Sequence, residues 1–185
     1  MCRNQNLFLN MKTTTKQIFA IMHVISWVVF VGLCIKAGAI LISYSVSMFV
    51  NEAGAKDLYM GLDLHSLYDS SKGYYTAVVS LIIVLLCLKA YVFYLLILIF
   101  RKLNLVHPFS REVVTLISKI SYVILSAGVL AMLAEGYNKW LFHRGIGSMY
   151  EWGSSELLFM GGIVFTIALI FQRGVEIQSE NELTI

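Results

Sequence analysis

Charged residues are scarce in this sequence, and proline is nearly absent. Of 185 residues only 14% are charged and one is proline, whereas 58% are apolar and the mean hydropathy is +0.76. A typical soluble domain is about a quarter charged and about half apolar. A chain of this size has too little interior to hide so much apolar surface from water. The composition therefore excludes an ordinary soluble domain and predicts an integral membrane protein.

The sequence also lacks the patterns of enzymes and cofactor-binding proteins. Its three cysteines and four histidines nowhere have zinc or di-iron spacing. Only His23 lies in an apolar run, whereas a haem held between membrane helices needs two facing ligands. There is no glycine-rich phosphate loop and no basic stripe interleaved with aromatic residues. We therefore expect no catalytic activity, no metal or cofactor, and no direct binding of nucleic acid.

Four long apolar runs, separated by polar segments, dominate the chain. A spanning helix needs about 20 apolar residues, so the runs predict an all-α, membrane-embedded four-helix bundle that forms one domain over residues 1–185. The first run exceeds one span at about 1.5 Å per residue and should tilt or project from the bilayer. The segment LDLHSLYD after it allows a short interfacial helix or an irregular lid. The expected helices are 18–50, 75–100, 112–135 and 156–176.

Lysine and arginine concentrate in two segments. The stretch before the first run carries Arg3, Lys12 and Lys16 and no acidic residue, and the 101–119 turn carries four basic residues against Glu112. Segments rich in Lys and Arg stay on the cytoplasmic side of a membrane. Both termini should therefore be cytoplasmic, with the two longer loops, 51–74 and 136–156, outside.

Two lysines lie inside the apolar runs, in the near-identical pentapeptides LCIKA (33–37) and LCLKA (86–90). The match does not extend into the flanks, so chance in two Leu- and Ala-rich helices explains it. Counted at about 1.5 Å per residue, Lys36 lies near the outer edge of the hydrocarbon and Lys89 near its middle. Lys36 can snorkel to the outer interface, which is harder for Lys89. Ionisable residues inside a span are candidates for a functional site.

Two glutamates lie at depths that suit these lysines. The Cα–Cβ bond tilts toward the N-terminus of a helix, so Lys89 leans outward while Lys36 and Glu135 lean inward. The sequence therefore predicts a polar centre of Lys36, Lys89, Glu135 and Glu156. The Lys89 ammonium should lie within about 4 Å of an oxygen of Glu135 or Glu156. Two interpretations stay open, a static ion pair that fixes helix packing and an ion or proton path.

Small and polar residues recur on one face of three of the predicted helices. In a bilayer such faces pack against neighbouring helices, because apolar side chains gain little by leaving lipid. The stripes expected to point inward are Gly32, Lys36, Ala39, Ser43 and Ser47 on the first helix, Ser121, Gly128 and Glu135 on the third, and Ser155, Gly162, Thr166 and Arg173 on the fourth.

Three segments, LKAYVFYLLILIFRKLNL, LVHPFSREVVTLISKISYVILSAGV and the tail FQRGVEIQSENELTI, resemble the membrane family called domain of unknown function 2975. The resemblance covers nearly the whole chain. It implies a four-helix protein of the bacterial cytoplasmic (inner) membrane without an assigned activity. It also implies that a small helix-turn-helix regulator is encoded nearby and is a plausible partner. It carries over no catalytic residue.

Two functions from different classes remain open. The first is a regulatory or interaction protein that works with a cytoplasmic partner. The second is a small transporter or channel, monomeric or oligomeric, that uses the polar centre. No span has the glycine or proline break typical of transporter substrate sites, so we rank the first above the second. Its predicted cytoplasmic interaction face consists of Arg101, Lys102, His107, Pro108, Phe109, Arg173 and Glu176.

Overall fold

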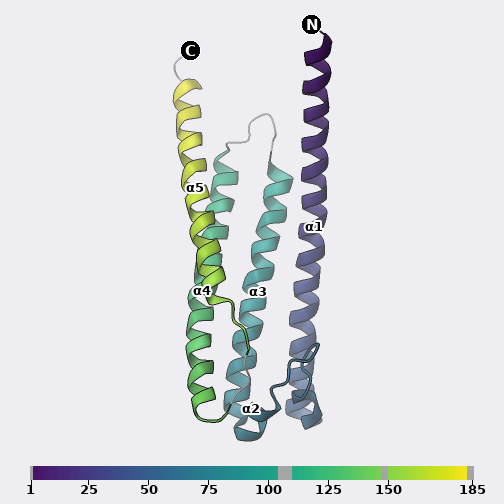
Figure 1. The fold of residues 1–185 in the computed structure, drawn as a ribbon, viewed down its shortest axis with the longest axis vertical. Coiled ribbons are helices and arrows are strands. Elements are labelled where there is room, and N and C mark those ends of the chain that lie inside the picture. Colours follow the sequence, from purple (N-terminus) through teal and green to yellow (C-terminus); the bar gives the residue numbers. More distant parts are fainter. Residues whose placement is uncertain (1, 104–109, 147–149, 183–185) are drawn as a thin grey trace.

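The computed structural model describes residues 2–103, 110–146 and 150–182, and in these ranges all regular structure is helical. Each of the four long helices is long and apolar enough to cross a membrane. The prediction of an all-α chain with four such helices is confirmed. A 3-10 helix, η1, and a short helix, α2, lie between the first two long helices (Figure 1). The bounds are α1 Cys2–Phe49, η1 Glu52–Ala55, α2 His65–Ser70, α3 Lys72–Lys102, α4 Arg111–His143 and α5 Ser154–Glu182.

Serine caps mark the starts of two long helices. The Ser71 side chain accepts a hydrogen bond from the backbone N–H of Gly73 at the start of α3. The Ser110 side chain accepts one from the backbone N–H of Val113 at the start of α4. Serine is a favoured N-cap because its oxygen pairs with a backbone donor that has no partner within the helix.

The four long helices form a row and not a closed ring. The backbone of α1 packs against α3, that of α3 against α4, and that of α4 against α5, and no other pair of long helices makes such contact in the described residues. Helices α1 and α5 are thus the two edges of the row. Both chain termini lie at one end, where α1 and α5 extend past the neighbouring ends of α3 and α4 (Figure 1). At about 1.5 Å per residue α1 is about 70 Å long, so it projects from any bilayer it crosses, as predicted.

All four long helices differ from their predicted bounds, and α3 differs least, with three added residues at its start and two at its end. Helix α1 begins at Cys2 and not near residue 18, α4 continues to His143 and not to about 135, and α5 continues to Glu182. The added turns of α4 contain the buried side chains of Asn138 and Leu141. These two side chains pack against the rest of the protein, which is why a segment whose polar residues suggested a loop is part of a helix.

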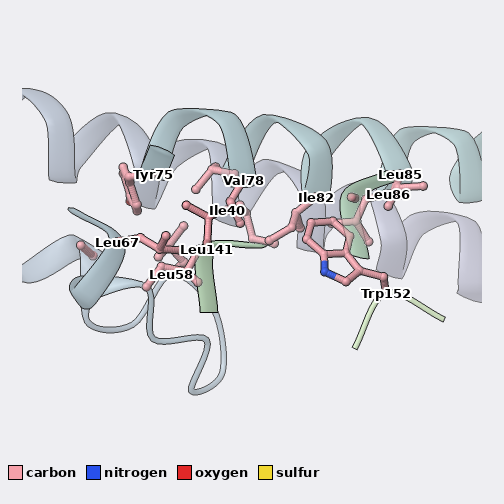
Figure 2. Packing of buried hydrophobic residues seen from close by; sticks show 14 of the residues in the cluster. Ile40, Leu58, Leu67, Tyr75, Val78, Ile82, Leu85, Leu86, Leu141 and Trp152 are labelled. Atoms are coloured by element: carbon pink, nitrogen blue, oxygen red, sulfur yellow. The ribbon is translucent and has the colours of Figure 1, made fainter. Parts of the chain in front are cut away.

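The largest core lies at the end of the molecule opposite the termini. It joins the end of α1, η1, α2, the first half of α3, the last turns of α4 and the α4–α5 connection. Figure 2 shows Ile40, Tyr75 and Trp152 among its side chains. Burying an apolar side chain is favourable when it would otherwise face water, but it contributes little when the side chain would otherwise face lipid. This core therefore extends beyond the hydrocarbon, where η1, α2 and the α4–α5 connection lie, and we call residues 40–86, 127–146 and 150–152 the cap.

The predicted inward faces are right on α4 and wrong on α5. On α4, Ser121 and Gly128 are buried and Glu135 is half-buried. On α1 the result is mixed, since Gly32 is exposed and Ser47 is buried. On α5 the buried stripe lies one residue before the predicted one. Small residues stand next to each other there, so two stripes with the same seven-residue spacing are possible, and packing against α4 selects one of them. On α5 the predicted Ser155, Gly162, Thr166 and Arg173 are exposed, whereas Ser154, Gly161 and Ala168 are buried.

A buried hydroxyl pair joins α1 to α3 inside the cap. The Tyr75 and Ser47 hydroxyl oxygens lie 2.7 Å apart, and the Ser47 hydroxyl also donates to the backbone carbonyl of Tyr44. Both residues are almost completely buried, Tyr75 at 0% and Ser47 at 2% exposure. Tyr75→Phe should lower the free energy of unfolding by only about 1 kcal/mol, because the Ser47 hydroxyl keeps its hydrogen bond to the Tyr44 carbonyl.

Ser47→Ala should cost more, about 1–3 kcal/mol, because it leaves the Tyr75 hydroxyl buried without this partner. Denaturant unfolding in detergent measures both changes. Tyr91→Phe is the control, since Tyr91 is exposed and its loss of a hydroxyl should change stability little. A smaller cost for Ser47→Ala than for Tyr75→Phe would contradict the assignment.

Candidate functional site

Glu135 lies at the junction of α4 and α5. Its carboxylate accepts a hydrogen bond from the Ser154 hydroxyl at the start of α5, and it forms an ion pair with Lys139, one turn further along α4, at 2.8 Å. The junction borders a cleft of about 530 Å³ whose wall includes Tyr150 and Glu156. An exposed i,i+4 ion pair stabilises little by itself. The hydrogen bond to Ser154 instead ties the first turn of α5 to α4.

The predicted ion pair between Lys89 and a glutamate is wrong. Among the described residues, neither Glu135 nor Glu156 has an oxygen within 4.0 Å of the Lys89 ammonium. Glu135 pairs with Lys139, and the Glu156 carboxylate accepts a hydrogen bond from the neighbouring Ser155 at 3.2 Å. This removes the contact on which the transport interpretation depended most.

The register of α3 against α4 explains the missing ion pair. The rings of Tyr74 on α3 and Trp140 on α4 meet edge to face, with centroids 6.1 Å apart. The helices are antiparallel, so counting from this contact places Lys89 level with Leu125. Glu135 is ten residues further along α4, which separates it from Lys89 by about 15 Å in depth.

The four predicted residues of the polar centre therefore divide into two groups. Glu135 and Glu156 lie on the α4–α5 side of the row, whereas Lys36 and Lys89 lie on α1 and α3. The two lysines are near enough for their charges to repel each other. Lys36 also places its ammonium 5.7 Å from the centroid of the Tyr59 ring, a cation–π contact. A functional role for either group stays a prediction.

A tight turn at residues 57–62 borders Lys36, and it was not predicted from the sequence. The Asp57 carboxylate accepts a hydrogen bond from the backbone N–H of Gly61 at 2.9 Å. Met60 and Gly61 both have positive φ, 48° and 86°, and for methionine this conformation is strained. The Asp and Gly of the segment DLYMG are the signal that would have predicted a turn.

A cavity of about 310 Å³ lies between this turn and Lys36. Its wall includes Tyr59 and Leu62 from the turn and Tyr150 from the α4–α5 connection. Burial raises the pKa of the Tyr150 hydroxyl above its ordinary value, because an apolar surrounding disfavours the phenolate. Tyr150 therefore stays protonated and remains a hydrogen-bond donor at neutral pH.

The predicted interaction face lies at the end of the molecule that carries both termini. Arg101 and Lys102 are the last residues of α3, and the Lys102 ammonium lies 2.9 Å from a Glu112 carboxylate oxygen at the start of α4. Arg173 and Glu176 form an ion pair of 2.7 Å within α5. The predicted residues His107, Pro108 and Phe109 lie outside the described residues.

A groove of about 450 Å³ between α4 and α5 adjoins this face, and no sequence pattern predicted it. Arg111, Thr115 and Ser118 line it from α4, and Gln172, Glu176 and Ser179 line it from α5.

In the described part of the chain, no three His, Cys, Asp or Glu side chains gather as a metal site requires.

Four helices of spanning length, joined by polar connections, define a multi-pass α-helical membrane protein. The chain belongs to the family described as "Protein of unknown function (DUF2975)", whose model matches residues 60–185. The resemblance seen in the sequence is confirmed over these residues, and not over nearly the whole chain. The match includes α2 to α5 and the last residues of the 57–62 turn, and it leaves α1 outside. No curated protein and no solved structure matches the chain.

Proposed function

We propose that the protein is a regulatory interaction protein of the bacterial inner membrane, with both termini in the cytoplasm. The basic residues at the end of the row that carries both termini support this orientation. Lys16, Arg101, Lys102 and Arg111 are exposed there, and Lys and Arg accumulate on the cytoplasmic side of a membrane.

The observation that carries the proposal is the extension of α5 beside the α4–α5 groove. Helix α5 continues nine residues past Arg173, which is the first charged residue after its apolar run. This extension carries an exposed apolar side chain, Ile177 at 59% exposure, beside the Arg173–Glu176 ion pair. Charged groups around an apolar centre are typical of a protein interface.

The partner we propose is a helix-turn-helix regulator. The ground for this choice is that the family resemblance implies that such a regulator is encoded nearby. Binding at the membrane would hold such a regulator away from DNA or present it there. The chain itself contributes the docking face and has no part in reading DNA.

Co-purification from detergent-solubilised membranes tests the proposal. The tagged full-length chain should retain the regulator, and deletion of residues 177–185 or the charge reversals Arg173→Glu and Glu176→Lys should lower the retained amount at least about tenfold, or about 1.4 kcal/mol. Lys139→Glu is the control, because Lys139 is also exposed and ion-paired but belongs to the cap. Unchanged retention by the deletion and by both charge reversals would refute the proposed face.

A further inference from the structure

Two lysines lie at membrane depth without a carboxylate to neutralise them. Lys36 is twenty residues from Lys16 on α1, about 30 Å, which is the thickness of the hydrocarbon core. Lys89 is twelve residues from Arg101 on α3, about 18 Å, and so lies inside that core. Among the described residues no Asp or Glu oxygen lies within 4.0 Å of either ammonium. An ionised side chain inside a membrane is costly, and such groups are normally paired or lie against a polar cavity.

The two ammonium groups approach each other from different depths. Helices α1 and α3 are antiparallel neighbours, held by the ring contacts Phe30–Tyr94 and Tyr44–Tyr75. Side chains lean toward the N-terminus of their own helix, so Lys36 leans into the bilayer and Lys89 leans out of it. Their mutual repulsion follows from this convergence. We call Lys36 and Lys89 the lysine pair.

The surface beside the lysine pair offers both hydrogen-bond donors and apolar contact, as a site for an amphiphilic ligand requires. The cavity next to Lys36 is walled by Tyr59 and Tyr150, whose hydroxyl groups are hydrogen-bond donors. Met60, at the tip of the 57–62 turn, is 86% exposed and held at a positive φ of 48°. A strained, exposed methionine at the level of the outer membrane surface places an apolar side chain where acyl chains begin.

We propose that the lysine pair and the 57–62 turn bind the phosphate of an anionic phospholipid from the outer leaflet of the membrane. The phosphate neutralises the two ammoniums, the tyrosines donate to its oxygens, and the acyl chains lie along α1, where Val31 and Ile35 are exposed. Depth favours a lipid over a dissolved phosphate, because Lys89 lies below the membrane surface and Met60 offers apolar contact. The site is distinct from the proposed interaction face, and only its assignment to the outer leaflet rests on the proposed orientation of the termini.

Native mass spectrometry of the detergent-purified chain with added lipids tests this site. Wild type should retain phosphatidylglycerol, which is anionic, and should retain phosphatidylcholine at least about tenfold less. Lys36→Gln and Lys89→Gln should each lower retention of phosphatidylglycerol about tenfold, or about 1.4 kcal/mol, while Lys36→Arg should keep most of it. Lys56→Gln is the matched control, since Lys56 is an exposed lysine of the same loop region.

A thermal-shift measurement gives a readout independent of lipid counting. Wild type should unfold at a higher temperature in phosphatidylglycerol vesicles than in phosphatidylcholine vesicles, because a ligand that binds the native state stabilises it. The double variant Lys36→Gln, Lys89→Gln should lose this difference while still showing a cooperative transition. Equal retention of both lipids, or retention unaffected by the double variant, would overturn the site. Competition by millimolar inorganic phosphate would assign the site to a dissolved anion and overturn the lipid.

Discussion

Gly161→Ala should destabilise the protein by about 1–3 kcal/mol, the usual cost of overpacking a close contact. A Cβ at Gly161 would lie 2.8 Å from a methyl carbon of Leu125 on α4 and 3.2 Å from the backbone nitrogen of the same residue. Gly128 mirrors this contact, since a Cβ there would lie 2.8 Å from Leu158 of α5 and 3.0 Å from its backbone nitrogen. The two glycines let α4 and α5 approach closely, as small residues do between membrane helices.

The next residue of α5 provides a matched control with the opposite sign. A Cβ at Gly162 meets no atom within 4 Å, so Gly162→Ala should change stability little or raise it by up to about 1 kcal/mol through helix propensity. Unfolding in detergent by heat or by a denaturing surfactant measures both variants. The double variant Gly128→Ala, Gly161→Ala should lose more than either single variant. The reverse order, with Gly162→Ala more damaging than Gly161→Ala, would show that α5 packs in the register predicted from sequence, and equal behaviour would contradict the close contact at Gly161.

Trp152→Ala should be the most damaging single change in the cap, at about 3–5 kcal/mol. Trp152 is 2% exposed and lies in the core against the side of α3 that carries Ile82, Leu85 and Leu86 (Figure 2). Its ring also meets Tyr150 edge to face, with centroids 4.9 Å apart. The side chain anchors the α4–α5 connection to α3, so its loss leaves a large void and frees that connection.

Trp152→Phe should by contrast cost less than about 1.5 kcal/mol. The indole N–H of Trp152 is buried and has no hydrogen-bond partner in the described residues, and removing such a donor offsets part of the lost ring contact. Trp140→Ala is the control, because Trp140 is 43% exposed and should cost much less than Trp152→Ala. Thermal unfolding of the three variants in one detergent gives the comparison. A large loss for Trp152→Phe would mean that the N–H has a partner such as a bound water.

The sequence predicted how deep each residue of the candidate site lies in the membrane, but not which of these residues come together. Counting residues along each helix placed Lys36 near the membrane surface and Lys89 well below it, because rise per residue is constant. Counting could not supply the register between α3 and α4, which the Tyr74–Trp140 contact shows. It also could not show that α1 and α5 lie at opposite edges of the row. The predicted ion pair failed for these two reasons.

The face of α5 was ambiguous for a related reason. Small residues are adjacent at Ser154 and Ser155 and again at Gly161 and Gly162, so helical periodicity allows two inward stripes. Leu125 and Leu158 decide between them, because each fills the space beside a glycine on the opposite helix. That complementarity exists only once the two helices are placed together.

The sequence by itself determined that the chain is an all-helical membrane protein with four long helices and which family it belongs to. The reason is that a bilayer requires every backbone polar group to be satisfied within the segment, which leaves an apolar run few alternatives to a helix. Only the tertiary structure decided the row of helices, the cap, the 57–62 turn beside Lys36 and the separation of the lysines from the glutamates. These depend on contacts between segments distant in sequence, where side-chain shape chooses among arrangements that apolar periodicity leaves equally favourable.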